Sequence, residues 1–299
     1  MDSKVRRTFI TTLVAVTLIL FSFFGLVFTG VIDLNGSKNN TPTGNIVPDI
    51  SVDEDKLALK QLWQDNHKIN NDYVGQLFFD SGLINVPFVQ AKDVYNANGE
   101  LYKFYTESGS VVSDPTGYTG NDVYIWTYWA TGEYDYNNNG GSVFMDYRNE
   151  LYDENLIIYG HHFSFWNDAT RKKAFTPIEQ LLEFKNYEEN KYLTLALENE
   201  IRKYELAVVY QYDDTDDYYF KNCQYWRTNY NYDDFEDVVD RSYYENYIKA
   251  IKEHQLYDTG VELTTNNKTL TLQTCISGHT GELFQILVFK EISVQPYVS

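Results

Sequence analysis

Two apolar segments, far apart in the chain, each end in a side chain suited to acyl-transfer chemistry. Residues 269–275 alternate β-branched and aliphatic side chains and place the thiol of Cys275 at their last position. Residues 156–159 form a second apolar run, which a glycine and His161 follow. An imidazole can hold a thiol as thiolate or supply a proton to a leaving group, so the pair provides the minimum parts of a cysteine acyltransferase or peptidase. We therefore expect the two strand ends to meet.

The remaining pattern predicts a mainly β fold. Short apolar runs punctuated by Gly, Asn and Asp occupy residues 73–79, 83–90, 142–147, 156–159, 192–197, 204–212, 261–265, 269–275 and 283–292. Many short strands with few helices between them favour a closed antiparallel barrel or sandwich over alternating strand–helix units. We find no internal repeat in the sequence.

Three segments carry helix signals. A capping-box pattern at Ser51–Glu54 and apolar residues at helical spacing predict a helix over 52–70. Thr176 and Pro177 mark the start of a second helix, with proline at its first position. Residues 241–255 place apolar side chains along one face and predict a helix shortly before the Cys275 strand.

The first 32 residues form a separate region. Three basic residues precede an uncharged run over 8–32. As a helix this run would be roughly 37 Å long, enough to cross a hydrocarbon core of about 30 Å. A cleaved signal peptide is the alternative, but its apolar part would be shorter and a small-residue cleavage site would follow. We therefore expect an uncleaved anchor with a cytoplasmic N-terminus.

This anchor divides the chain into three parts. Residues 1–32 would form the cytoplasmic tip and the single transmembrane span, and 33–50, rich in Asn, Gly and Pro, would be a linker. Residues 51–299 would then be the catalytic domain, on the outer side of the cell membrane.

The exterior part is strongly acidic. The whole chain has 24 basic and 43 acidic residues, a net charge of −19, and residues 33–299 alone carry about −21 because three basic residues and one acidic residue precede the span. This charge makes nucleic acid and anionic membrane surfaces poor partners and would attract an amine-bearing co-substrate. Solubility alone explains the charge equally well. The charge also works against a thiolate, so we expect a largely neutral thiol and a slow enzyme.

The chain has only two cysteines, Cys223 and Cys275. In an exterior domain they could form a disulfide. A domain of this size buries an adequate core without such a link, so we expect a free thiol at Cys275. Mass spectrometry of the unreduced protein distinguishes the two states.

The order of these segments resembles the class B sortases. The matching stretches carry NDYVGQL, INVPFVQ, GSVFMDYRN, LIIYGHH, LYDTGV and TLQTC, at residues 71–77, 84–90, 141–149, 156–162, 256–261 and 271–275. The match implies a closed sortase-type antiparallel β-barrel, with an N-terminal helix and a helix before the catalytic-cysteine strand. His162 stands where the family usually has asparagine.

The resemblance implies a cysteine transpeptidase of Gram-positive bacteria. Cys275 would attack a backbone carbonyl in the C-terminal sorting signal of a secreted protein, with His161 as its partner. An amine of a peptidoglycan precursor or a pilin lysine would then release the thioester acyl-enzyme. Thr274, beside the thiol, and Tyr232, in an aromatic stretch before the 241–255 helix, would contact the substrate. No cofactor or metal is expected, because the acidic loops at 213–219 and 230–237 match no known calcium loop.

His279 is the strongest competitor of His161 as partner of the thiol. It follows Cys275 by four residues, in a loop from which it could reach the sulfur. His161 is preferred because it completes the IYGH match to the family. The alternative for His161 itself is a structural histidine at a strand end.

The sequence departs from the family after the cysteine. Sortases carry an arginine at the start of the next strand, which is thought to stabilise the oxyanion, and Gln285 falls at that position in an ungapped alignment. Gln285 would be a neutral donor, or only an alternating strand residue. Other arginines, namely Arg148, Arg171, Arg227 and Arg241, could come in from elsewhere. The missing arginine motivates one alternative, a catalytically weak sortase-fold binding module; an unrelated anchored cysteine peptidase is another.

Overall fold

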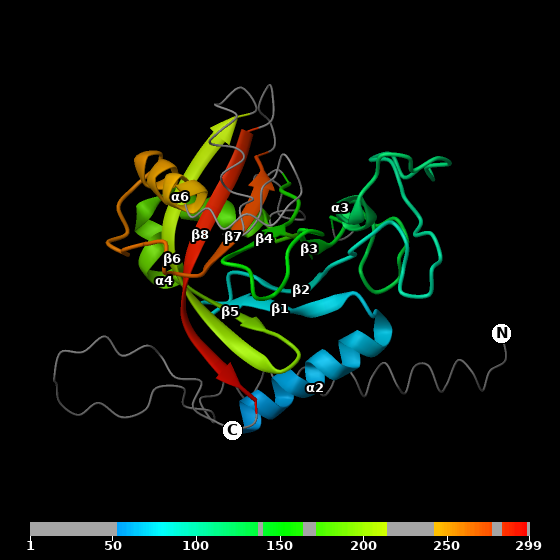
Figure 1. Ribbon diagram of the computed structural model, residues 1–299, viewed down its shortest axis with the longest axis horizontal. Helices are drawn as coiled ribbons and strands as arrows, with labels where there is room; N and C mark the ends of the chain where they lie inside the picture. Colours follow the sequence, from blue (N-terminus) through cyan, green and yellow to red (C-terminus); the bar gives the residue numbers. More distant parts are fainter. Residues whose placement is uncertain (1–52, 137–139, 164–171, 214–241, 277–282, 298–299) are drawn as a thin grey trace. The chain divides into compact units, whose positions relative to one another are not determined.

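The structure is a computed structural model that describes residues 53–136, 140–163, 172–213, 242–276 and 283–297 (Figure 1). The chain divides into two compact units, residues 1–48 and 49–299, and all described residues belong to the second unit. The expected anchor over 1–32 and the linker over 33–50 lie outside the described residues. Within the described ranges, no helix has the length and apolar character needed to cross a membrane.

Eight strands form a closed barrel in the order β1-β2-β3-β4-β7-β8-β6-β5. Their bounds are β1 Tyr73–Phe79, β2 Asn85–Val89, β3 Val143–Met145, β4 Asn155–Tyr159, β5 Tyr192–Ala196, β6 Glu200–Asp213, β7 Thr269–Cys275 and β8 Leu283–Pro296. The predicted mainly β barrel is confirmed, and the predicted bounds of β1 and β7 agree with the structure. Closure leaves no exposed sheet edge, which is how such a barrel avoids edge-to-edge pairing.

The barrel is not antiparallel throughout. β2 pairs with β3, and β4 with β7, in parallel, whereas the other neighbouring strands run antiparallel. A parallel pair requires a long crossover, and β5, β6 and α6 (Ser242–Glu253) lie between β4 and β7 in the chain. Apolar alternation along a strand is the same in either direction, so the sequence pattern could not show this. The parallel pair brings the C-terminal ends of β4 and β7 to the same rim.

Helices surround the barrel. α2 (Asp53–Ile69) precedes β1, and α6 precedes β7, as expected for the N-terminal helix and the helix before the cysteine strand. The segment after Phe175 forms a 3-10 helix, η1 (Thr176–Leu182), followed by η2 (Phe184–Asn186) and α4 (Tyr187–Asn190). The expected strand over 261–265 is wrong. That segment pairs with no strand, and its Leu263 is buried with the apolar side chains around α6.

Two of the three apolar clusters among the described residues fix the barrel and α6. One fills the barrel with side chains from almost every strand, including Leu77, Phe88, Ile158, Leu272 and Leu287. The other joins side chains of α6, β6 and β8, and Figure 1 shows α6 beside these two strands. Each fully buried Leu or Phe stabilises the fold by about 1.5–3 kcal/mol relative to an exposed one. The strand ends at the rim therefore stand on a rigid scaffold.

A short repeat occupies part of the long connection between β2 and β3. In residues 94–102, Tyr102 donates to the carbonyl of Val94 at 3.0 Å; in residues 104–112, Val112 donates in the same way to Phe104 at 2.9 Å. Each unit also closes its turn by an N–H bond from its glycine to the residue three before it, at 2.9 Å in both. The two units thus share a backbone hydrogen-bond pattern, although we find no internal repeat in the sequence. α3 (Gly120–Tyr124) follows in the same connection.

Candidate active site

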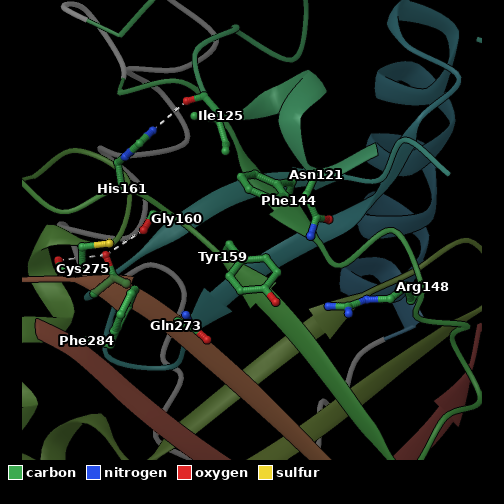
Figure 2. A pocket seen from close by; sticks show the side chains of 11 residues that line it. Asn121, Ile125, Phe144, Arg148, Tyr159, Gly160, His161, Gln273, Cys275 and Phe284 are labelled. Carbon is green, nitrogen blue, oxygen red and sulfur yellow. Dashed lines mark hydrogen bonds between the residues drawn. The ribbon is translucent and has the colours of Figure 1, made fainter. Parts of the chain in front are cut away.

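The ends of β4 and β7 place His161 and Cys275 on adjoining positions. Tyr159 is paired with Gln273 at the end of the parallel ladder. The next residues continue it, because Gly160 donates its N–H to the carbonyl of Gln273 at 3.2 Å. His161 and Cys275 each come two residues after this last pair, on strands that lie about 4.8 Å apart in the ladder. Both line one cavity of about 300 Å³ (Figure 2).

Thr274 links the two strand ends. Its hydroxyl donates to the carbonyl oxygen of Gly160 at 2.6 Å, and only 2% of the residue is exposed. Thr274 does line the cavity, as expected for a substrate contact, but its hydroxyl is engaged by the β4 backbone. This side chain therefore holds the thiol-bearing strand against the histidine-bearing one.

Gly160 is required by close packing. A Cβ added at this position would come within 2.7 Å of the ring of Phe175. Phe175 in turn donates its N–H to the carbonyl of His161 at 2.9 Å, so the fully buried ring closes over the backbone that carries the imidazole. Gly160 thus allows the Phe175 ring to pack closely, and this packing fixes the backbone position of His161.

His161 has one ring nitrogen fixed. Its Nε2 lies 2.7 Å from the carbonyl oxygen of Ile125, and Figure 2 shows the ring pointing toward that carbonyl. A carbonyl only accepts hydrogen bonds, so Nε2 carries the proton and Nδ1 has the free lone pair. Burial lowers the pKa of His161, although the Ile125 carbonyl and the charge of Glu107 act in the opposite direction. The imidazole is therefore neutral at pH 7 and able to accept a proton.

Cys275 is exposed at the end of β7 and is not part of a disulfide. The alternative of a disulfide with Cys223 is thus not what the structure shows at Cys275, and Cys223 itself lies outside the described residues. Exposure leaves the sulfur accessible to a substrate from the cavity side. The thiol is thus more exposed than the half-buried imidazole of His161, although both line the same cavity.

Gln285 does not reach the cavity. It is fully buried, and its amide donates to the carbonyl of Ile178 at 2.7 Å, on the opposite face of β8 from the thiol. Phe284 is the residue paired with Cys275, and Phe284 lines the cavity. The expectation that Gln285 acts on the oxyanion therefore does not agree with the geometry, because one step along a strand turns a side chain to the other face.

The far end of the cavity is polar. Arg148, in the loop after β3, donates to buried Asp146 from Nε at 2.8 Å and from Nη2 at 2.6 Å. Tyr159 also donates to Asp146, at 2.8 Å, and Asn121 lines the cavity beside them. Burial opposes ionisation of Asp146, but the bonds and charge of Arg148 outweigh it and lower the pKa of Asp146. This ion pair is charged and rigid.

Arg148 is the arginine that the described residues place at the cavity; the other three candidates, Arg171, Arg227 and Arg241, lie outside them. The guanidinium of Arg148 donates to Asp146, as the hydroxyl of Tyr159 does. In the part of the chain that the structure describes, the thiol therefore has an aromatic neighbour, Phe284, where a cation was sought.

The other histidines have separate environments. The side chain of His162 is 2% exposed and lies 2.8 Å from a carboxylate oxygen of Glu179, away from the cavity lining. His67 stacks on Trp63 in α2. His279 and Tyr232 lie outside the described residues, so their proposed roles remain predictions. Across the described ranges, no three His, Cys, Asp or Glu side chains gather closely enough to hold a metal ion.

Sequence reasoning missed the groups that surround His161. Ile125, Trp126 and Tyr136 all come from the connection between β2 and β3, which showed no regular apolar period. The richness of this connection in Trp and Tyr was the one available signal. It could not be assigned, because aromatic residues most often serve only to pack a core.

The closed mixed barrel, with a cysteine and a histidine at the ends of neighbouring parallel strands, is similar in fold to solved sortase B structures. The *Clostridium perfringens* sortase B crystal structure matches with a TM-score of 0.56 at 24% identity, covering 77% of this chain and 99% of that one. A *Staphylococcus aureus* sortase B–substrate complex matches with a TM-score of 0.55 at 22% identity, covering 81% and 87%.

Sequence relatives point to the same class. Sortase B of *Listeria monocytogenes* is 25% identical over 217 residues, and sortase B of *S. aureus* is 30% identical over 154 residues. These matches cover 71% and 51% of this chain, and they span 66% and 54% of the relatives' own lengths. No protein-family model matches the chain. These relatives agree with the ordered motifs: the chain is similar in sequence to curated sortase B proteins, over two thirds or less of their length.

Proposed function

We propose that this protein is a cysteine transpeptidase that cleaves a C-terminal sorting signal of secreted proteins and transfers the acyl part to an amine. One observation carries the proposal: His161 and Cys275 stand on adjoining ends of two parallel strands and line the same cavity. The similarity to sortase B supports the reaction class, and a solved structure of similar fold is described as a S. aureus sortase B–substrate complex, which supports a substrate site here.

The neutral imidazole suits the first step. Cys275 Sγ forms a bond to the scissile carbonyl carbon while its proton passes to Nδ1 of His161. The tetrahedral intermediate then collapses to a thioester. The carbon–nitrogen bond breaks, and the imidazolium gives the same proton to the leaving amine.

The second step reverses the roles. An acceptor amine gives up a proton to His161 as its nitrogen attacks the thioester carbonyl. The proton returns to sulfur, and the product amide leaves with the free thiol restored. No net proton is consumed over the cycle. A peptidoglycan precursor amine and a pilin lysine are the two acceptor classes that the resemblance implies.

The surroundings of the thiol indicate a slow enzyme. Phe284, rather than a cation, faces Cys275, and removal of one oxyanion donor typically lowers a rate by about 10²–10³-fold. The half-buried His161, whose pKa burial lowers, also offers no positive charge that would favour a resting thiolate. Both features lower the rate without removing the chemistry.

The cellular setting belongs to the same proposal. Residues 1–32 would anchor the chain in the cell membrane with the N-terminus in the cytoplasm, and 33–50 would link this anchor to an extracellular domain over 51–299. The acidic exterior part would attract cationic amines and repel nucleic acid.

The test uses the full-length chain in detergent with a library of sorting-signal peptides and an amine acceptor such as triglycine. We expect ligated product that requires both the amine and Cys275, with Cys275→Ala as the matched control. Binding of a peptide without turnover would replace this proposal by a binding module. Hydrolysis that the amine does not redirect would indicate a plain cysteine peptidase.

A further inference from the structure

Three aromatic rings surround the imidazole of His161. Trp126 stacks on it, with ring centroids 4.9 Å apart and planes 24° from parallel. Tyr136 meets it edge-on at 5.2 Å and 71°. Phe163 lies at 6.4 Å on a further side. Together with the carbonyl of Ile125, these rings leave the imidazole few alternative orientations.

The surrounding rings also contact one another. Trp126 and Tyr136 pack edge to face at 4.9 Å and 85°, and Tyr136 lies 5.1 Å from Phe163. Gly140 makes room for this arrangement, since a Cβ there would come within 2.3 Å of the ring of Phe163. We name Trp126, Tyr136 and Phe163 the aromatic clamp. Rings that support each other resist rotation better than single contacts do.

The clamp restricts the rotation of the His161 ring, which a single hydrogen bond to the Ile125 carbonyl does not prevent. Rotating the imidazole about its Cβ–Cγ bond would move Nε2 off the Ile125 carbonyl and take Nδ1 away from its present side. A stacked indole opposes that rotation because it fixes the ring plane. The indole face also attracts an imidazolium, since cations are favoured over aromatic faces. The clamp would therefore stabilise both the resting ring and the charged form that catalysis creates.

The charged and titratable groups around this site are few. Glu107, from the second repeat unit, acts electrostatically on both His161 and Tyr136. Burial is the main reason that the pKa of Tyr136 is raised, with smaller effects of Glu107, Tyr134 and Cys275. Tyr134, two residues before Tyr136 of the clamp, donates its hydroxyl to the carbonyl of Glu107 at 2.5 Å. Cys275 is thus within electrostatic range of the clamp.

Most of these groups come from the connection between β2 and β3. Ile125, Trp126, Tyr136 and Glu107 lie in it, whereas His161 follows β4. The barrel places His161 next to the thiol, and the connection determines how its ring is turned. These are two independent structural tasks, which different parts of the sequence perform.

We propose that Trp126 and Tyr136 are positioning residues, which hold the His161 ring with Nε2 on the Ile125 carbonyl so that Nδ1 exchanges the proton with Cys275. This inference rests on the proposed transpeptidase function. It adds to that function a role for the β2–β3 connection, a segment that contains neither His161 nor Cys275.

Nitrogen NMR of histidine-labelled full-length protein in detergent tests the arrangement without any substrate. We expect the wild-type His161 to show one tautomer, with the proton on Nε2. Trp126→Leu should give a mixture of tautomers, and Trp126→Phe, which keeps a stacking face, should restore the single form. A proton on Nδ1 in the wild type, or an unchanged spectrum in Trp126→Leu, would overturn the proposal.

Kinetics of the same variants provide the second readout. Trp126→Leu should lower kcat about tenfold while KM changes less than about twofold, because a misoriented base affects the reacting step and not peptide binding. Tyr136→Leu should act in the same direction, and Tyr136→Phe should recover most of the rate. Equal losses in Leu and Phe variants would contradict a role of the ring faces.

The two readouts separate this inference from the proposed function. A chain that holds one Nε2–H tautomer but ligates no peptide would overturn the transpeptidase and reduce the clamp to a structural role. Ligation that persists at full rate in Trp126→Leu and Tyr136→Leu would leave the function standing and reject the positioning role. Circular dichroism melting identifies any variant that fails to fold. If one of Trp126→Leu and Tyr136→Leu does not fold, the other tests the positioning role.

Discussion

Phe284 lies directly opposite Cys275 across the β7–β8 pair, and its ring lines the cavity that holds the thiol. Opposed residues of an antiparallel pair stand on the same face, with Cβ atoms about 4.5–5.5 Å apart. The ring of Phe284 also stacks on Tyr212, 5.0 Å away. A hydrogen-bond donor at position 284 could stabilise the oxyanion of a substrate bound to the thiol. This chain has an aromatic residue at that position.

Replacement of Phe284 by arginine should therefore speed acyl-enzyme formation. The guanidinium would stand beside the sulfur and could donate to the developing oxyanion, and we expect a gain of about tenfold in the rate of this step. Stopped-flow or quench measurements with a peptide substrate provide the rate. Phe284→Leu is the matched control and should give no gain. Equal rates in the two variants would show that position 284 does not face the reacting carbonyl.

Position 285 should respond in the opposite way. Gln285→Arg would place a cation in a fully buried site beside η1, and we expect a loss of about 3–5 kcal/mol in the free energy of unfolding with no gain in rate. Gln285→Met should change stability by less than about 1.5 kcal/mol, since it removes the bond to Ile178 together with a buried acceptor that has no partner among the described residues. Urea unfolding measures both. A stable and faster Gln285→Arg enzyme would return the oxyanion role to this position.

Gly160→Ala should damage both stability and activity. The added Cβ would meet the Phe175 ring at 2.7 Å, and overpacking of this kind costs about 1–3 kcal/mol. Phe175 donates its N–H to the carbonyl of His161, so a shift of Phe175 that relieves the clash should also move the imidazole and lower kcat. Thermal unfolding and single-turnover kinetics measure the two effects. A second substitution, Phe175→Leu, should restore part of both; the lack of any rescue would contradict the clash as the cause.

The acid limb of the pH–rate profile should lie below the ordinary histidine range. Burial lowers the pKa of His161 from 6.5, so the imidazole remains a neutral base as the pH falls through 6.5 and is lost only below it. Its contribution to stability has the same sign: it is complete above pH 6.5 and is lost as the pH falls toward the folded-state pKa. Measurement of kcat/KM against pH tests this. An acid limb above pH 6.5 would show that the imidazole is held charged, not neutral.

Asp146→Asn should destabilise the rim of the cavity. Asp146 is 1% exposed and holds the Arg148 fork with two hydrogen bonds, so the substitution removes the counter-charge of a half-buried guanidinium. Such a loss typically costs about 3–5 kcal/mol. Chemical denaturation compares the variant with wild type and with a double variant, Asp146→Asn with Arg148→Met. The double variant should recover part of the loss, and failure to do so would argue against the ion pair as the source.

The strands that carry the chemistry were predictable because their signals are local. Residues 269–275 alternate apolar side chains up to the cysteine, and the structure gives β7 those bounds. The helix before it was also predictable, from an apolar face over 241–255 that α6 presents to β6 and β8. The parallel pairing of β4 with β7 was not, because pairing direction depends on the crossover between the strands.

The surroundings of the two reactive residues were much harder to predict. An ungapped count from Cys275 reaches Gln285, but the β7–β8 register shows that Phe284 faces the thiol, and a difference of one residue reverses the face. The Ile125 carbonyl and the Trp126 ring come from a connection without a regular period. Contacts of this kind depend on tertiary packing, which no local pattern records.

The most direct test of the account is intact-protein mass spectrometry of the full-length chain during turnover of a sorting-signal peptide without an acceptor amine. We expect an adduct with the mass of the N-terminal peptide fragment, held by Cys275 as a thioester, which an added amine removes and which Cys275→Ala never forms. Peptide cleavage that proceeds without this adduct, or that survives in Cys275→Ala, would contradict the central claim that the thiol beside His161 carries the acyl group.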